Sequence, residues 1–420
     1  MSNIDPAGTV MERIEALARI SEEPGRLTRT FCSPAMRQAN DLVGSWMREA
    51  GMTVSEDAIG NLIGRYPGRD ERAKTFLLGS HLDTVRDAGK FDGPLGVITA
   101  IACVQQLHQN QVQLPFAIEV IGFADEEGVR YQTTYLGSKA LAGTFNEQDL
   151  KRVDSRGVSM AEAIKSFGGD PGKINSAKRD PHNLLGYAEV HIEQGPVLEK
   201  KYQPVGVVSA IAGQTRIKVR FTGRAGHAGT TPMNLRQDAL TAAAEFITAV
   251  ESSARAQAGL VATVGQIEAK PGASNVIPGE VNLTLDVRHQ LDAMRTAAVE
   301  RLQNLANQIG EKRGLTMDWE IVHEAQSVPC SRELSDMLAK GARQHLMEVT
   351  ELPSGAGHDA AVMGDITPVA MLFVRCKGGI SHHPDESVEV DDVRVAIEVM
   401  NGFLLSLGNQ KHPSPSKKNV

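Results

Sequence analysis

Aromatic residues are scarce in this chain of 420 residues, at 4% of the total. The hydrophobic core must therefore be built mainly from Leu, Ile, Val, Ala and Met. Hydrophobic residues make up 41% and charged residues 23%, with signs interspersed and a formal net charge of −7. These fractions are typical of a soluble globular protein. The length favours two domains over one.

Long apolar runs and basic blocks are both missing. No run approaches the roughly 20 apolar residues that a membrane-spanning helix needs. The first twenty residues mix acidic and basic side chains at helical spacing, which is not the pattern of a signal peptide. Without a basic block, nothing predicts a nucleic-acid surface. We therefore expect neither a membrane nor a nucleic acid as partner.

The four cysteines are scattered, and none forms a CxxC pair. They are Cys32, Cys103, Cys330 and Cys376. Such spacing excludes a thiolate metal site of the usual kind and indicates buried or spare thiols in a reducing compartment. We expect a cytoplasmic protein.

The stretch from Gly79 to Val97, GSHLDTVRDAGKFDGPLGV, carries the first sign of chemistry. An apolar run over Thr75–Leu78 leads into His81 and Asp83. Asp92 stands directly before Gly93-Pro94 and a helix-like apolar segment. A strand that ends in His-x-Asp, followed by a carboxylate where a helix begins, predicts the start of a metal site.

Two further buried strands end in the same kind of cluster. FAIEVIGFA, residues 116–124, is followed by Asp125-Glu126-Glu127-Gly128. The strand over residues 186–192 contains His191 and is followed by Glu-Gln-Gly-Pro. Ligands of open α/β sheets bind at the carboxyl ends of the strands. The sequence therefore predicts an α/β fold, a sheet flanked by helices, with a site at this edge.

The pattern changes near residue 211. Strands expected over 214–223, 261–267, 281–287 and 317–322 alternate with helices expected over 235–256 and 291–313. The order βαββαβ predicts a small, ferredoxin-like α+β layer inserted into the first domain. We assign residues 1–211 and 327–410 to the catalytic domain, 212–326 to an inserted lid and dimerisation domain, and 411–420 to a disordered tail.

A set of imidazole and carboxylate groups could hold two metal ions. Two neighbouring ions need about three ligands each, with one group shared. Asp92 is the best bridge because a carboxylate offers one oxygen to each ion. Without thiolates the set allows manganese, zinc, cobalt or nickel. The predicted ligands are His81, Asp92, Glu127, His191 and His382.

Two acidic residues beside these ligands have different predicted roles. Asp83 points to the same side as His81 and could accept the imidazole N–H that does not face the metal. Glu126 precedes the ligand Glu127, points another way, and could act as general base on a water molecule.

Each of these residues also has a structural interpretation. A lone histidine at a strand end is more often hydrogen-bonded or at the surface, and a Glu-Glu pair is usually a solvated loop. The metal interpretation is favoured by coincidence. Four separate strand-to-loop transitions, the last from a strand expected over 368–375 towards His382, deliver metal-type ligands to one expected edge.

Several motifs resemble the amidohydrolases that cleave N-carbamoyl and ureido compounds, relatives of the dinuclear aminoacylases and aminopeptidases. They are GSHLDTV, GKFDGPLGV, ADEEGVRY, HIEQGPVLE, GHAGTTPM, SNVIPG and GISHHP, in family order between about Ser33 and Leu407. Within the family, IAGQTRIKV, GHAGTTPMNLRQD and MLFVRCKGGISHHPDE are particularly similar to allantoate amidohydrolases. N-carbamoyl-L-amino-acid hydrolases share the metal motifs, but resemble this chain less around Gln214.

The resemblance implies the same five ligands, two divalent ions per subunit, Asp83 as support for His81 and Glu126 as catalytic base. It implies a homodimer in which His227, from the inserted domain, polarises the scissile carbonyl in the partner's site. It also implies that Asn275 and Arg288 grip the substrate carboxylate.

The same resemblance places Gln194 and Gln214 near the ureido or carboxylate groups of the substrate. Taken alone, His227 could be a turn histidine between glycines, Arg288 a surface residue and Asn275 the start of a turn. His383 stands where many relatives carry a small polar residue. One step along an extended backbone from His382, it should point away from the site.

The function expected from these features is hydrolysis of a small ureido acid, with allantoate as the first choice. The alternatives are an N-carbamoyl-L-amino-acid hydrolase, a ureidoglycolate or β-ureidopropionate hydrolase, and a non-catalytic binding protein on the same fold.

Overall fold

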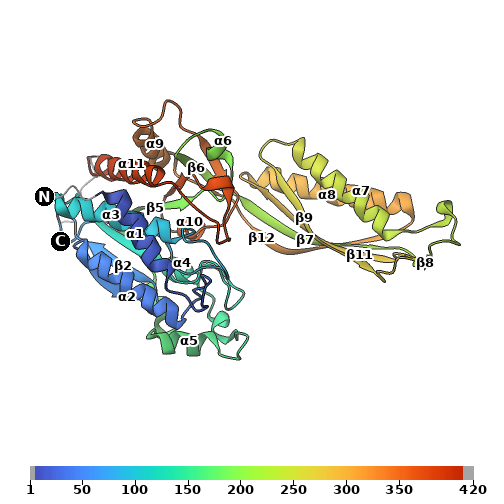
Figure 1. The fold of residues 1–420 in the computed structure, drawn as a ribbon, viewed down its shortest axis with the longest axis horizontal. Coiled ribbons are helices and arrows are strands. Elements are labelled where there is room, and N and C mark those ends of the chain that lie inside the picture. Colours follow the sequence, from blue (N-terminus) through green and yellow to red (C-terminus); the bar gives the residue numbers. More distant parts are fainter. Residues whose placement is uncertain (1–4, 410–420) are drawn as a thin grey trace, which may run out of the picture. The chain divides into compact units, whose positions relative to one another are not determined.

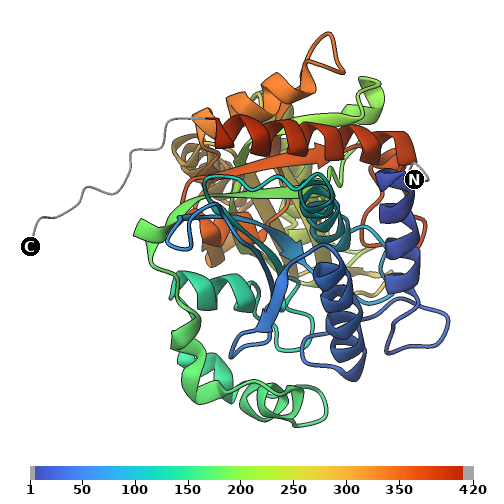
Figure 2. The same cartoon turned by 90° about the vertical axis from the view of Figure 1, so that its left-hand side faces the viewer.

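The computed structural model describes residues 5–409, and the chain divides into two compact units. The first unit contains the described residues up to Ser209, then Cys330–Leu352, and those from His358 onward. The second contains Ala210–Pro329 and Pro353–Gly357. Figure 1 shows both units as ribbons, and Figure 2 shows them turned by 90°. The predicted disordered tail, 411–420, lies outside the described residues.

A mixed nine-stranded sheet, most of whose residues belong to the first unit, has the order β1-β2-β4-β3-β5-β15-β6-β13, with β14 paired to β6. Its strands are β1 (Thr53–Glu56), β2 (Leu62–Tyr66), β3 (Thr75–His81), β4 (Ala117–Phe123), β5 (Leu184–Ile192), β6 (Val205–Ile211), β13 (Val328–Pro329), β14 (Glu351–Ser354) and β15 (Val369–Val374).

Four central strands of this sheet, β4, β3, β5 and β15, are mutually parallel. Every residue of β3, β4 and β15 is buried, as expected for strands that are covered on both faces. Because these strands run the same way, their carboxyl ends meet at one edge of the sheet.

Helices pack around the sheet and close its core. α3 contacts β3, β4 and β5 and also packs on α1 and α11, while α10 contacts α4, β5 and β15. The helices of this unit are α1 (Pro6–Ala18), α2 (Pro34–Glu49), α3 (Pro94–Gln109), α4 (Leu136–Ala142), α5 (Met160–Phe167), α6 (Val197–Lys200), α9 (Arg332–Ala342), α10 (Asp359–Met363) and α11 (Val390–Gly408).

The loops at the carboxyl edge contain residues in an unusual backbone conformation. Asp125, Gln194 and His382 all have φ near +55°, in the left-handed region. Such a conformation costs free energy for a residue with a side chain and is concentrated at functional sites. These residues follow β4, β5 and β15, the strands whose ends were predicted to carry the site.

The second unit is a four-stranded antiparallel sheet with two long helices. The strands β7 (Gly213–Thr222), β9 (Val261–Lys270), β11 (Glu280–His289) and β12 (Thr316–Ala325) lie in the order β12-β7-β11-β9. With α7 (Ala239–Arg255) and α8 (Asp292–Arg313), the chain order is βαββαβ, a split βαβ arrangement. The predicted fold, α/β with a ferredoxin-like α+β insertion, is confirmed.

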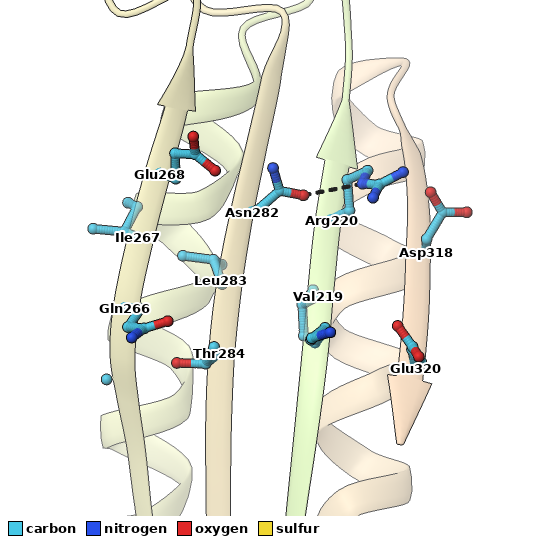
Figure 3. A pocket seen from close by; sticks show the side chains of 12 residues that line it. Val219, Arg220, Gln266, Ile267, Glu268, Asn282, Leu283, Thr284, Asp318 and Glu320 are labelled. Carbon is cyan, nitrogen blue, oxygen red and sulfur yellow. Dashed lines mark hydrogen bonds between the residues drawn. The ribbon is translucent and has the colours of Figure 1, made fainter. Parts of the chain in front are cut away.

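Alternation along the strands explains why the helices cover one face of this sheet. In β11 every second residue is buried, and Leu283 and Leu285 pack with Phe221, Phe246 and Leu302 in one core. The other face carries polar side chains, among them Arg220, whose Nε donates to Asn282 Oδ1 at 3.0 Å (Figure 3).

One short segment belongs to a different unit from the one that was predicted. Pro353–Gly357 was expected in the catalytic domain, but it lies with the second unit. Ala212 N donates to Ser354 O, and Arg288 Nη1 donates to Gly355 O at 2.6 Å. These contacts join segments that are far apart in the sequence, so no local sequence pattern predicts them.

No helix among residues 5–409 is long and apolar enough to cross a membrane.

Candidate metal centre and catalytic site

His81 ends β3 and presents its ring to the loop that follows. Its Nδ1 lies 2.9 Å from the main-chain oxygen of Asp83, so this nitrogen carries the proton and donates it. The other nitrogen, Nε2, lies 3.8 Å from Asp92 Oδ1. The unprotonated nitrogen therefore faces the carboxylate, as a metal-binding imidazole requires.

Asp92 stands at the centre of the cluster, just before α3. Its Oδ1 lies 3.1 Å from His191 Nε2, while its Oδ2 lies 3.1 Å from His382 Nε2. Gly93 has φ 69°, and a Cβ there would come within 2.5 Å of the His81 ring. Only glycine allows the loop to carry Asp92 this close to the ring.

His191, in β5, has a fixed tautomer. Its Nδ1 lies 3.0 Å from Ile192 O, and its Nε2 accepts a hydrogen bond from Gly93 N at 3.2 Å. The His358 ring packs against it edge to face, with centroids 4.5 Å apart. Both the tautomer and the ring orientation are thus set before any ion binds.

Glu127 and His382 form the outer part of the cluster. Glu127 Oε1 lies 3.3 Å from His382 Nε2. Hydrogen bonds to Asp92 and Glu127 raise the pKa of His382 to about 10. The position between these two carboxylates therefore favours a positive charge. His383 is exposed and its Nδ1 accepts from Asp385 N, so it points elsewhere.

The Asp83 carboxylate makes different hydrogen bonds from the one that was predicted. The carboxylate accepts hydrogen bonds from Glu126 N at 3.0 Å and Glu127 N at 3.1 Å. Its main-chain oxygen accepts from His81, whereas its Oδ1 lies 3.6 Å from His81 Nδ1. Asp83 therefore ties the first strand's loop to the Glu126-Glu127 loop as well as orienting His81.

Glu126 lies inside the cluster and is 8% exposed. Burial, together with the charges of Glu127, Asp359 and Asp83, raises the pKa of Glu126 well above its usual range, against the effect of His81. A carboxylate with a raised pKa is a stronger proton acceptor, which suits a general base.

The donor atoms fall into groups that each fit one ion. Ligand atoms of His81, Asp92 and His191 lie within 4.8 Å of one another, and so do those of Asp92, Glu127 and His382. Asp92 belongs to both groups and offers a different oxygen to each. This is the arrangement that two ions with one bridging carboxylate require.

The surroundings of the cluster are strongly acidic. Burial acts to raise the pKa of Asp92, but the hydrogen bonds of His191 and His382 and the charges of His191 and His81 hold it well below its usual range. Arg29 places one buried guanidinium near Asp83. So many carboxylates in a low-dielectric region are costly unless cations or protons balance their charge. The carboxylate residues of this region are Asp83, Asp92, Asp125, Glu126, Glu127, Glu189, Asp359 and Glu386.

Gln194 lies at the same cluster, after β5. Its Nε2 donates to Asp92 Oδ2 at 3.0 Å and to Ser381 Oγ at 3.2 Å. Ser381 Oγ donates to the same Asp92 oxygen at 2.6 Å. Gln194 is therefore placed beside the acidic centre.

Gln214 and Arg288 converge on one carboxylate in the second unit. Arg288 Nε and Nη2 donate to the two oxygens of Asp286 at 2.9 and 3.0 Å. Gln214 Nε2 donates to Asp286 Oδ2 at 2.5 Å, and Arg216 Nε lies 3.4 Å from the same oxygen. Asp286 thus orients the guanidinium that was predicted to grip a substrate carboxylate.

His227 and Asn275 form a separate pair. His227 ends the short strand β8 (Gly226–His227), which pairs with β10 (Val276–Ile277). Asn275 O accepts from Ala228 N at 2.9 Å, and both side chains are exposed. Figure 1 labels β8 beyond the end of β11.

The two pairs lie at opposite ends of the four-stranded sheet. Arg288 is opposite Gln214 in the β11–β7 ladder, and Glu280, eight positions earlier, is opposite Thr222. Gly279 O, next to Glu280, accepts from Gly223 N just before β8. Eight positions span roughly 27 Å. One subunit therefore does not bring all four residues to one small substrate.

A family model described as peptidase family M20/M25/M40 matches residues 77–406. The chain belongs to this family. The match includes most of β3, the loop with Asp92, the whole second unit and the segment with His382.

Several M20/M25/M40-family relatives are similar over most of their length. Allantoate deiminase 1 from Glycine max is 44% identical, over 94% of this chain and 88% of that protein. N-carbamoyl-L-amino acid amidohydrolase from Geobacillus stearothermophilus is 41% identical, over 93% and 95%. A crystal structure of an amidase of the hydantoinase/carbamoylase family from Burkholderia multivorans has a TM-score of 0.90 and 30% identity, over 96% and 98%.

These relatives identify this member of the M20/M25/M40 family as an amidohydrolase. The predicted resemblance and the predicted hydrolase class are both confirmed. The candidate ligands stand at the carboxyl ends of parallel strands, where the sequence placed them.

Some residues of the site in this M20/M25/M40-family chain were not singled out from the sequence. Glu189 is fully buried in β5 and accepts from Ser80 Oγ at 2.7 Å and Tyr187 Oη at 2.9 Å. Its ligand atom also lies within 4.8 Å of His191 and His358. One signal was visible, because Glu189 is the single acidic residue of a strand that was expected to be buried.

Proposed function

We propose that this amidohydrolase cleaves a ureido C–N bond of a small ureido acid, and that the substrate is allantoate. The observation that carries the proposal is the convergence of two donor groups on the two oxygens of Asp92. The identity of 44% to an allantoate deiminase supports the choice of substrate. The products would be ureidoglycine or its breakdown product, ammonia and carbon dioxide.

His81, His191 and Asp92 would hold one divalent ion, and Asp92, Glu127 and His382 a second. The fixed tautomers of His81 and His191 fit this assignment, because both direct Nε2 towards Asp92. Imidazole and carboxylate donors suit manganese or zinc, with cobalt or nickel as further possibilities. When bound, the ions supply Lewis acidity and lower the pKa of a water molecule.

The residues of the chain divide the proton transfers and the binding between them. Glu126 takes a proton from the water that attacks the carbamoyl carbon and returns one to the leaving nitrogen. His227 donates a hydrogen bond to the oxygen on which negative charge develops. Gln194 lies beside Asp92, where it can bind a ureido group.

A homodimer would complete the site. His227 and Asn275 lie roughly 27 Å along the sheet from Gln214 and Arg288, so we propose that His227 acts in the partner's site. The edge strands β9 and β12 carry exposed apolar side chains, Val261, Ile267, Ile321 and Val322, which suit a subunit interface. The proposal places the enzyme in the cytoplasm, in keeping with four free cysteines among the described residues.

Steady-state assays with manganese would test the proposal. We expect kcat/KM to be highest for allantoate, with N-carbamoyl-L-amino acids as the comparison, because a relative at 41% identity is named for those substrates. A clear preference for an N-carbamoyl amino acid would replace the substrate and keep the reaction class. Loss of about two ions per chain on dialysis, with no turnover of any ureido acid, would indicate a binding protein instead.

Arg288 offers a test of substrate binding. We expect Arg288→Gln to raise KM for allantoate by roughly 10- to 100-fold, since a charge-assisted hydrogen bond contributes about 1.5–3 kcal/mol. kcat should change less. Arg216→Gln is the matched control, because Arg216 contacts the same Asp286 oxygen but only at 3.4 Å. Equal effects of both changes on KM would show that Arg288 does not bind the carboxylate.

A further inference from the structure

We propose that Glu386 is a positioning residue that holds the loop carrying Asp92 in place and thereby sets the affinity of the centre for its metal ions. The inference rests on the proposed function, because it concerns the same two-ion site. It assigns a role to a residue that binds neither metal nor substrate.

The contact is unusually direct for residues so far apart in the chain. Glu386 Oε1 accepts hydrogen bonds from Phe91 N at 2.7 Å and from Asp92 N at 2.9 Å, across 295 and 294 positions of sequence. Glu386 is 3% exposed and Asp92 4%. One buried oxygen thus fixes two consecutive peptide groups, including that of the residue shared by both donor groups.

The loop is shaped to admit this side chain. A Cβ at Gly89 would come within 2.3 Å of Glu386 Cδ and 2.5 Å of Glu386 Oε1. Gly89 is not among the residues with positive φ, so its backbone does not itself require glycine. The contact with Glu386 explains why this position lacks a side chain.

Glu386 also connects the segment that carries His382 with the loop that carries Asp92. It follows His382 by four residues, and its N–H donates to His383 O at 3.0 Å in the same turn. The segment therefore supplies the candidate ligand His382, and it also accepts a hydrogen bond from the main-chain N–H of the candidate ligand Asp92. His382 Nε2 and Asp92 Oδ2 lie 3.1 Å apart, and the hydrogen bond from Asp92 N to Glu386 joins the two segments that carry them.

A carboxylate is a costly choice at this position unless hydrogen bonding requires it. Burial and the charge of Asp92 raise the pKa of Glu386 to about 7. An apolar residue of similar size would fill the space without that cost. The two main-chain N–H groups would then be left buried without an acceptor, and the loop would relax.

Two substitutions separate hydrogen bonding from packing. Glu386→Leu fills the space but accepts no hydrogen bond, whereas Glu386→Gln keeps an oxygen that can accept both. Titration of Mn²⁺ into the metal-free full-length protein by calorimetry is the readout. We expect Leu to weaken binding about 10- to 100-fold, as loss of a residue that supports a ligand does, and Gln to restore most of the affinity. A role in packing alone would make Leu the better replacement.

Glu193→Leu is the matched control. Glu193 also accepts two main-chain hydrogen bonds at 2.7 and 2.9 Å, but from Val197 and Leu198 at the start of α6. It is similarly buried, at 8% exposure. We expect a comparable loss of thermal stability from both leucine variants, and a large loss of metal affinity only from the one at Glu386.

Amide hydrogen exchange of the metal-free protein gives a second readout. Exchange at Phe91 and Asp92 should speed up in Glu386→Leu and stay near the wild-type rate in Glu386→Gln. Gly89→Ala should act in the same direction as Glu386→Leu, because its Cβ displaces the carboxylate.

The outcomes distinguish this inference from the proposed function. Tight Mn²⁺ binding by the wild type together with unchanged binding by Glu386→Leu would overturn the positioning role alone. Failure of the wild type to bind Mn²⁺ or Zn²⁺ would overturn the proposed function and, with it, this inference.

Discussion

Replacing Glu126 with Gln should lower kcat for ureido-acid hydrolysis by about 10²- to 10⁴-fold, the usual contribution of a general acid–base group. The amide cannot accept a proton from water, but it keeps the size of the side chain. Glu126 is held in place through its main-chain N–H, which donates to Asp83, so the substitution leaves that contact intact. The bound metal should therefore stay at the wild-type level.

Single-turnover kinetics and metal analysis on the same sample would separate the two effects. Asp125→Asn is the matched control. It neutralises the adjacent buried carboxylate, which is in none of the donor groups, and asparagine tolerates the φ of 56° at that position. Retention of near-normal kcat by Glu126→Gln, or an equal loss in both variants, would show that another group is the base.

Replacing Asp92 with Asn should remove both ions at once and lower kcat/KM by roughly 10³-fold or more, equivalent to about 4 kcal/mol. The amide nitrogen cannot bind a cation, and one of the two donor groups is left without its oxygen. The charge that balances both ions is also lost. We therefore expect Asp92→Asn to weaken the binding of both ions. Replacement of a ligand that serves a single ion would weaken the binding of that ion only.

Metal content after dialysis, measured by elemental analysis, checks this result. Asp87→Asn is a control in the same loop, because Asp87 is half-buried, its side chain is 44% exposed, and its φ of 53° accommodates asparagine. Full retention of one ion by Asp92→Asn would mean that Asp92 serves only one site and that the two-ion arrangement is wrong.

The position of the candidate site could be predicted because it follows from strand burial. Runs such as FAIEVIGFA are apolar except for one residue, which identifies central parallel strands, and the carboxyl ends of parallel strands must meet. His81, Glu127 and His191 then lie together whatever the details of the loops. The family resemblance extended this reasoning to the residues of the inserted domain.

Contacts between distant loops could not be predicted in the same way. Which atom of Asp83 meets His81 depends on the turn that follows β3, and there the main-chain oxygen is the closer one. Glu386 looks like an ordinary loop acid in sequence. Its contact with the Asp92 loop exists only because β15 brings the two segments to one edge.

The pairing register of the strands also could not be predicted from local sequence patterns. Gln214, His227, Asn275 and Arg288 were all predicted from resemblance to bind substrate, and nothing in their spacing reveals how far apart they are. The β11–β7 pairing places Gln214 opposite Arg288, and it separates both from His227 by the length of the strands.

That separation has a consequence for how the enzyme would behave in solution. If His227 is supplied by a partner, as proposed, the catalytic unit would be the dimer and the single chain would be an incomplete enzyme. Specific activity would then fall on dilution below the dissociation constant of the dimer, as linkage between assembly and function requires. Subunit exchange, rather than any change within one chain, would become a means of switching activity on and off.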